Sequence, residues 1–96
     1  MIIKDKLFGE EWRIKKEKYC WTVQKYSHKH GSTEIWKSTD FYSSIKDAAL
    51  RILKYKLLDE HKDKRMDLAE YILLMRANVY IAERFANSIE NHKSAV

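Results

Sequence analysis

Only a few side chains in this 96-residue chain could carry chemistry by their type and spacing. His28 and His30 stand two positions apart in a polar segment, and two imidazoles can serve as ligands of a zinc ion. No nearby cysteine or paired carboxylates accompany them, so solvent-facing turn residues are the favoured interpretation. The sequence therefore predicts no metal site.

Nucleophilic catalysis has equally little support. Cys20 is the single cysteine, and no histidine and asparagine partners can be assigned to it, so a structural thiol is favoured. Ser43 and Ser44 lack the glycine-rich elbow of a catalytic serine, and a helix cap explains them better. A glycine-rich phosphate loop is absent from the sequence. We expect no catalytic residue, no cofactor and a protein that is not an enzyme.

Aromatic and basic residues in the first half of the chain form a more informative group. The aromatic residues are Trp12, Tyr19, Trp21, Tyr26, Trp36, Phe41 and Tyr42, and the basic ones are Arg13, Lys15, Lys16, Lys18, Lys25 and Lys37. A basic aromatic face of this kind can contact nucleic acid. The alternation of apolar and polar residues instead favours a sheet whose core-facing side carries all three tryptophans. The opposite face is then the candidate surface for DNA or an acidic protein, with Arg13, Lys15, Thr22, Gln24 and Lys37.

Three runs of alternating polarity must position these side chains, and each predicts a β-strand. They cover residues 11–16, 19–26 and 33–39, and polar turns separate them, the second of which contains Gly31. Within residues 11–39 we therefore expect a three-stranded antiparallel meander. Its one apolar face needs a helix to cover it.

Two helices are predicted after the sheet. Ser43 or Ser44 can cap the first, over residues 45–58. The charged residues 59–65 are either a solvated loop or the polar first turn of a long second helix, which is predicted over 64–91 and begins near Asp63 or Asp67. The apolar stripe of the first helix is Ile45, Ala49, Ile52, Leu53 and Leu57. The predicted fold is thus a single α+β domain, residues 1–96, with the three-stranded meander, a covering helix and a long C-terminal helix. Leu7 and Phe8 can pack against its core.

The long helix carries more apolar surface than one stripe needs. One row has heptad spacing and consists of Leu68, Ile72, Met75, Val79, Ala82, Ala86 and Ile89, and a second row of Leu74, Ile81 and Phe85 runs beside it. We expect one row to pack inside the domain, whereas the rest is a candidate dimer or partner helix. The residues of that candidate surface are Leu74, Ile81, Phe85, Ala82, Ala86 and Ile89, with small alanines that permit close helix approach.

The net charge of +5 belongs to the front of the chain and to the link between the helices, while the long helix is close to neutral. A mild basic excess can favour anionic partners. One cysteine suits a reducing compartment. The N-terminus lacks the pattern of a signal peptide and no apolar run could span a membrane, so we expect a cytoplasmic protein.

Two resemblances rest on short motifs. The segment Phe41-Tyr42-Ser43-Ser44-Ile45-Lys46-Asp47-Ala48-Ala49 after three strands resembles the arm-type DNA-binding domain of phage integrases, with Asp47-Ala48 in place of its Glu-Ala. That resemblance covers residues 11–58 and implies a sheet that enters the major groove. The layout as a whole is similar to small uncharacterised accessory proteins of phages and prophages, through Phe41-Tyr42-Ser43, Ala48-Ala49-Leu50-Arg51-Ile52-Leu53 and Asp67-Leu68-Ala69-Glu70.

These observations lead to two functional hypotheses. The first is a non-catalytic interaction protein of phage or mobile-element type that binds and inhibits a host macromolecule, such as a defence system, in the host cytoplasm. The second is a small DNA-binding module that uses the polar basic face of the sheet. A protein partner is expected under the first hypothesis, nucleic acid under the second, and a membrane under neither. Homodimerisation stays open.

Overall fold

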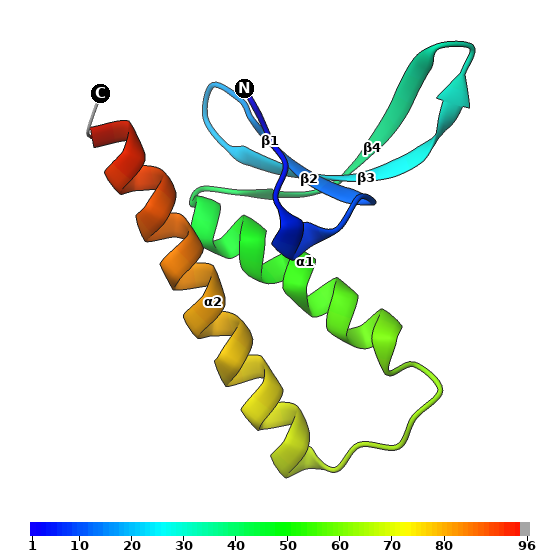
Figure 1. Ribbon diagram of the computed structural model, residues 1–96, viewed down its shortest axis with the longest axis vertical. Coiled ribbons are helices and arrows are strands. Elements are labelled where there is room, and N and C mark those ends of the chain that lie inside the picture. The colour runs from blue at the N-terminus through cyan, green and yellow to red at the C-terminus, as the bar shows by residue number, and fades with distance from the viewer. Residues whose placement is uncertain (95–96) are drawn as a thin grey trace.

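The computed structural model describes residues 1–94, and the side chains of residues 1–90, as an α+β fold. Along the chain the elements are β1 (Ile2–Ile3), the 3₁₀ turn η1 (Lys6–Phe8), β2 (Trp12–Lys16), β3 (Trp21–His30), β4 (Thr33–Tyr42), α1 (Ile45–Glu60) and α2 (Leu68–Ser94). The strands form one antiparallel sheet in the order β1-β2-β3-β4 (Figure 1). Within the described residues, no helix combines the length and the apolar character that crossing a membrane requires.

The prediction of a three-stranded sheet is wrong, because β1 adds a fourth strand. Ile2 pairs with Lys15 and Ile3 with Ile14, and the Lys16 amide donates to the Met1 carbonyl at 2.8 Å. A strand of two residues has no alternation for a periodicity argument to detect. It forms here because the free edge of β2 offers backbone partners to the N-terminal residues.

A bulge in β4 overturns the predicted common face of the three tryptophans. Val23 pairs with Asp40, but the next residue, Gln24, pairs with Ser38, so Thr39 is an extra residue on β4. Such an insertion reverses the alternation of all residues beyond it. Trp36 therefore lies on the outer face of the sheet, away from the helices, while Trp12 is buried against them and Trp21 is half-buried there.

Capping residues define where both helices begin. The Ser44 hydroxyl accepts a hydrogen bond from the Asp47 amide at 3.2 Å, and α1 runs from Ile45 to Glu60, beyond the predicted end at residue 58. The Asp67 carboxylate accepts from the Glu70 amide at 2.9 Å, so α2 begins at Leu68 instead of residue 64. Each cap satisfies an amide that the first turn leaves without an intrahelical partner.

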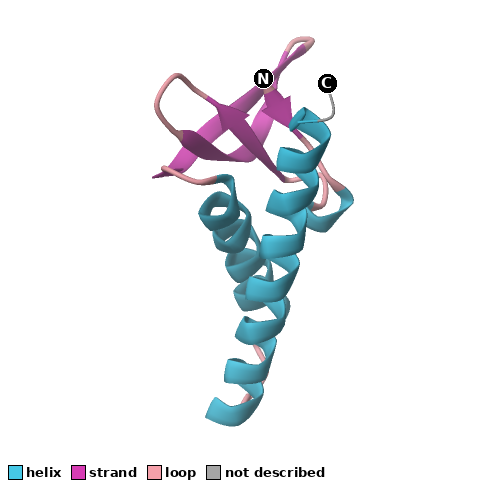
Figure 2. Ribbon diagram, turned by 90° about the vertical axis from the view of Figure 1, so that its left-hand side faces the viewer, coloured by secondary structure: helices cyan, strands magenta, loops and turns pink. Residues whose placement is uncertain are grey.

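The core lies between the inner face of the sheet, α1 and the C-terminal half of α2. Ile14, Val23 and Ile52 are fully buried there, and Phe8 from η1 joins them. Figures 1 and 2 show that the sheet covers one end of the antiparallel α1–α2 pair, while the other end extends beyond it. The radius of gyration is 14.6 Å, larger than the roughly 13 Å of a compact domain of this size, as the overhang requires.

A polar cluster ties β4 to α1. Tyr55 Oη donates to Asp40 Oδ2 at 2.9 Å, and Arg51 Nε donates to Tyr42 Oη at 2.6 Å and lies 3.7 Å from Asp40 Oδ1. The hydrogen bond to Asp40, followed by burial, raises the pKa of Tyr55 above its ordinary value of 10.0. The protonated hydroxyl is thus the form that the fold prefers.

The raised pKa of Tyr55 makes this cluster sensitive to alkaline pH. A raised folded-state pKa contributes stability that is complete below the unfolded pKa and is lost as pH rises through the folded pKa. We expect wild type to be more stable than Tyr55→Phe by a constant margin up to about pH 9, and the margin to shrink above about pH 10. Urea unfolding of both proteins, followed by circular dichroism across this range, measures the margin. A margin that stays constant into strong alkali would contradict the assignment.

Candidate interaction surface

The polar face that the sequence offers to DNA is largely occupied by the protein itself. Arg13 Nε donates to Gln24 Oε1 at 2.7 Å, and Gln24 Nε2 donates to Ser38 Oγ at 3.3 Å. The guanidinium of Arg13 also lies 4.2 Å from the centre of the Trp36 ring, a cation–π contact. Burial lowers the pKa of Arg13, and the carboxylate of Glu34 acts against this shift. Arg13 and Gln24 therefore support the sheet instead of facing a ligand.

The other three residues of that predicted surface do not complete it. Thr22 is fully buried, and the ammonium of Lys15 lies 4.0 Å from the Glu17 carboxylate. Lys37 is exposed but pairs across the strands with Lys25, whose ammonium lies over the Trp12 ring on the helix side of the sheet. The bulge in β4 thus separates Lys37 from Arg13, and the five residues do not share one accessible face.

The residues with possible chemistry lie apart from one another. The Ser27 hydroxyl lies 2.8 Å from His28 Nδ1 on the exposed hairpin, and His30 is exposed beside the turn. The thiol of Cys20 is partly buried near Glu17 and Thr22. Among the described residues, no group of three histidine, cysteine or acidic side chains is placed to hold a metal ion.

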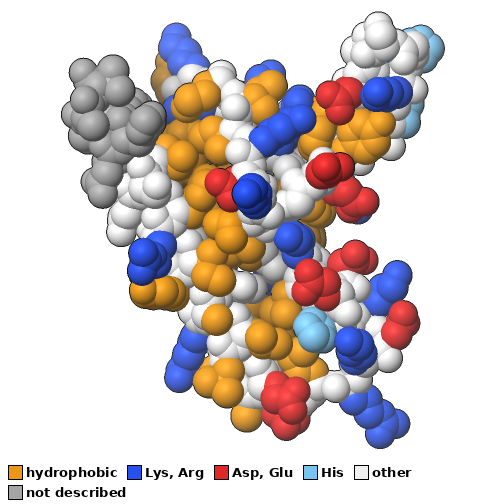
Figure 3. Space-filling model, in the orientation of Figure 1, with side chains coloured by type: hydrophobic (Ala, Val, Ile, Leu, Met, Phe, Trp, Pro, Cys, Tyr) orange, Lys and Arg blue, Asp and Glu red, His pale blue; other side chains and the backbone are white. Residues whose placement is uncertain are grey.

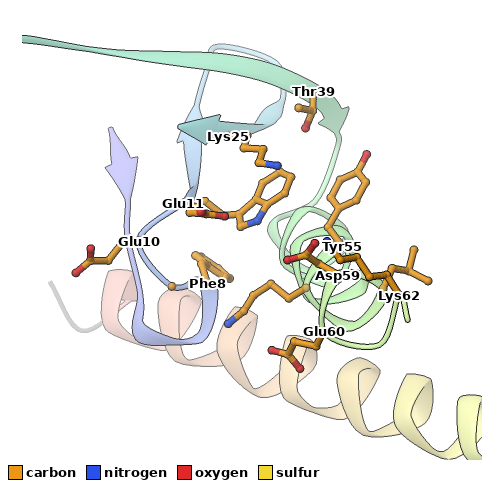
Figure 4. A pocket seen from close by; sticks show the side chains of 13 residues that line it. Phe8, Glu10, Glu11, Lys25, Thr39, Tyr55, Asp59, Glu60 and Lys62 are labelled. Carbon is orange, nitrogen blue, oxygen red and sulfur yellow. The ribbon is translucent and has the colours of Figure 1, made fainter. Parts of the chain in front are cut away.

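An open cleft of about 630 Å³ separates the sheet from the end of α1. Its aromatic lining residues are Phe8, Trp12 and Tyr55, and the rings of Trp12 and Tyr55 stack with centres 4.9 Å apart. Figure 4 shows the side chains around the cleft, among them Phe8 and Tyr55. The charged side chains around it are Glu10, Glu11, Asp59, Glu60, Lys25, Lys56 and Lys62. Lys56 is already bound to the Leu7 carbonyl at 2.8 Å. With charges of both signs at its edge, the cleft selects no class of charged ligand.

The helix surface predicted for a dimer or partner is mostly internal. Ala82, Phe85 and Ala86 are buried in the core, and Ile81 and Ile89 pack against it. The ring of Phe85 meets that of Phe8 edge-to-face, with centres 5.1 Å apart. Leu74 is the one member of the predicted set that is classed as exposed, at 36% of its surface. The predicted rows therefore divide along the length of α2: the C-terminal half is core, and the N-terminal half is not.

A different apolar stripe on α2 faces outward. At about 100° per residue, Leu73, Leu74, Ala77, Tyr80 and Ile81 fall on one side of the helix, turned away from Ala82 and Ala86. We call these five residues the α2 outer stripe. Leu73 is 65% exposed and Tyr80 58%, while Ala77 is exposed and Ile81 is partly buried. Figure 3 shows hydrophobic side chains on the surface of the helical pair away from the sheet.

Charged residues bound the α2 outer stripe. Glu70 lies one turn before Leu73 and Leu74, and Arg84 one turn after Tyr80. Arg84 Nη1 donates to Tyr80 Oη at 2.9 Å, and its guanidinium lies 5.6 Å from the ring centre. The stripe is thus an apolar strip with an acidic residue at one end and a basic residue at the other.

Three members of this stripe were not predicted from the sequence: Leu73, Ala77 and Tyr80. The periodicity that could have identified them was present, since these residues repeat at the spacing of four and three that is typical of one helix face. Phe85 and Leu74 lie almost on the same side of the helix, so periodicity could not separate them. Phe8 of η1 covers Phe85, and that contact comes from the far end of the chain.

Comparisons of the chain with models of protein families, with curated proteins and with solved structures found no match.

Proposed function

We propose that the protein is a non-catalytic interaction protein that binds another protein chain through the α2 outer stripe. One observation carries the proposal: large apolar side chains stand exposed at the part of the helical pair that the sheet does not cover. Leu73 and Tyr80 of the α2 outer stripe are each more than half exposed. Contiguous apolar surface of this kind marks binding sites on proteins that otherwise bury such residues.

The form of the stripe favours a helix as the binding element of the partner. Leu73, Ala77 and Tyr80 are spaced as anchors of helix-on-helix packing, and Ala77 leaves room for a close approach. The resemblance to phage and prophage accessory proteins supports inhibition of a host protein as the purpose of binding. The host cytoplasm is the compartment that this purpose requires, and the single cysteine agrees with it.

The alternative function, DNA binding through the sheet, has weaker support. Its five residues are split between two faces, and Thr22 and Gln24 are buried. The net charge of +5 remains in its favour. A salt titration with duplex DNA tests it, because electrostatic binding weakens steeply as salt rises. Binding at low salt that Arg13→Ala and Lys15→Ala both weaken would favour the DNA alternative.

Binding through the stripe is tested with Leu73→Lys, which places a charge on the apolar surface without touching the core. Its control is Asn87→Lys, the same new charge at an exposed position off the stripe. Each immobilised variant is offered two probes: the purified chain carrying a different tag, and a bacterial lysate. We expect wild type and Asn87→Lys to retain a protein from at least one probe. The amount that Leu73→Lys retains should be at least tenfold lower. Equal retention by all three, or none by wild type, would contradict the proposal.

A further inference from the structure

We propose that the α2 outer stripe binds the same stripe of a second copy, so that two α2 helices cross antiparallel on a two-fold axis at Ala77. This inference rests on the proposed function and names the partner of the same surface. A two-fold interface must be complementary to itself, because each patch meets an identical patch. Few apolar stripes are complementary to themselves in both shape and charge. The residue order of α2 makes the α2 outer stripe one of them.

The sequence of the stripe is nearly symmetric about Ala77. In an antiparallel pair with its axis at Ala77, residues at equal distances on either side of it come level with each other. Leu73 of one copy is then level with Ile81 of the other, and Leu74 with Tyr80. Apolar side chains thus meet apolar side chains along the whole contact between the two stripes, which we call the seam. No charged residue comes level with them on the other helix.

Charge complementarity favours an identical copy over an unrelated helix. Glu70 and Arg84 each lie seven residues from Ala77, about 10.5 Å along the helix. The two-fold axis brings Glu70 of each copy level with Arg84 of the other. Oppositely charged residues therefore face each other at both ends of the seam. An unrelated helix would have to supply a base and an acid at these same heights. Within one chain Arg84 contacts Tyr80, which keeps the guanidinium beside the stripe.

The surroundings of Ala77 permit the approach. Ala77 is exposed and has the smallest side chain of the stripe, so the two backbones can come close at the crossing point. Figures 1 and 2 show the sheet at the C-terminal end of α2, whereas Ala77 belongs to the N-terminal half of that helix, which spans Leu68–Ser94. An antiparallel partner places its own sheet at the opposite end of the pair.

Charge reversal gives the sharpest test, read out by sedimentation equilibrium over about 1–500 µM. We expect wild type to form a dimer with a micromolar dissociation constant. Glu70→Arg and Arg84→Glu should each raise that constant about tenfold, and the two together should return it to within about threefold of wild type. Arg76→Glu, an exposed charge reversal on α2 off the stripe, should leave it unchanged. Circular dichroism of each variant confirms that the fold is retained.

A disulfide trap locates the axis. In a Cys20→Ser background, Ala77→Cys should form an intermolecular disulfide on mild oxidation, because copies of this position meet at the axis. Ala69→Cys is the matched control, also an exposed alanine of α2. Its two copies would lie about 24 Å apart along the pair, beyond the reach of a disulfide.

The outcomes separate this inference from the proposed function. A chain that stays monomeric at about 500 µM overturns the inference. So does a dimer whose dissociation constant is unchanged by both charge reversals and whose disulfide forms equally well from either cysteine position. If the chain is monomeric but Leu73→Lys abolishes capture of a lysate protein, the proposed function stands with a different partner. If neither probe binds, both proposals fail.

Discussion

Replacing Phe85 with alanine is expected to lower the free energy of unfolding by about 3–5 kcal/mol, a large fraction of the stability of a domain this small. Phe85 is only 7% exposed and packs edge-to-face on Phe8, so its removal leaves a cavity between η1, α1 and α2. Urea unfolding at low protein concentration, followed by circular dichroism, measures the change. Low concentration keeps any association between copies out of the result.

Leu74→Ala is the matched control for Phe85→Ala. Leu74 lies on nearly the same side of α2, but it is one-third exposed and belongs to the outer stripe. Its replacement should cost about 1–2 kcal/mol of folding stability, clearly less than that of Phe85. Equal losses for the two variants would show that the division of α2 into a core half and an exposed half is incorrect.

Phe8→Ala is expected to have a comparable effect, about 3–5 kcal/mol, although Phe8 lies in a three-residue turn near the N-terminus. Its ring is almost completely buried and joins the core cluster of Ile14, Ile52 and Phe85. The N-terminal segment is therefore part of the folded core and not an appendage. Thermal and urea unfolding of the variant test this directly.

The control for Phe8→Ala is its neighbour Leu7, in the same turn but 37% exposed. Leu7→Ala should cost less, about 1–2 kcal/mol, since more than a third of the Leu7 side chain stays in water in the folded state. The double variant Phe8→Ala with Phe85→Ala should lose less than the sum of the single losses, by about 0.5–1.5 kcal/mol for the ring pair. Additive losses would contradict a direct contact between the rings.

Long periodic segments were the predictable part of the fold. Alternation in residues 12–16 and 21–26, the Ser44 cap and the helical spacing after residue 68 each correspond to an observed element. β1 was missed because two residues carry no period, and its pairing depends on an edge that only the folded sheet provides. The extra residue in β4 was missed for a related reason: its position is set by pairing with β3, and the sequence of β4 alone does not show where the alternation reverses.

The candidate surface was predictable only in part. Helical spacing identified excess apolar residues on α2 and included Leu74 and Ile81, which belong to the outer stripe. It could not decide which of them a distant segment would cover, and Phe8 covers Phe85. Similarly, the alternation placed Thr22 and Gln24 opposite the tryptophan face but gave no sign that Trp36 and Ser38 would join them there.

The register of β4 also governs how the sheet meets other molecules. β4 is an edge strand of ten residues, since only β3 pairs with it in the sheet. A long edge strand that is flat is a template on which another chain can add a strand, the first step of aggregation. The two register shifts between β3 and β4 twist this edge, and Glu34, Lys37 and Asp40 place charges along it. We therefore expect this edge to resist strand addition, so that association through helix packing, as proposed above, does not compete with aggregation through β4.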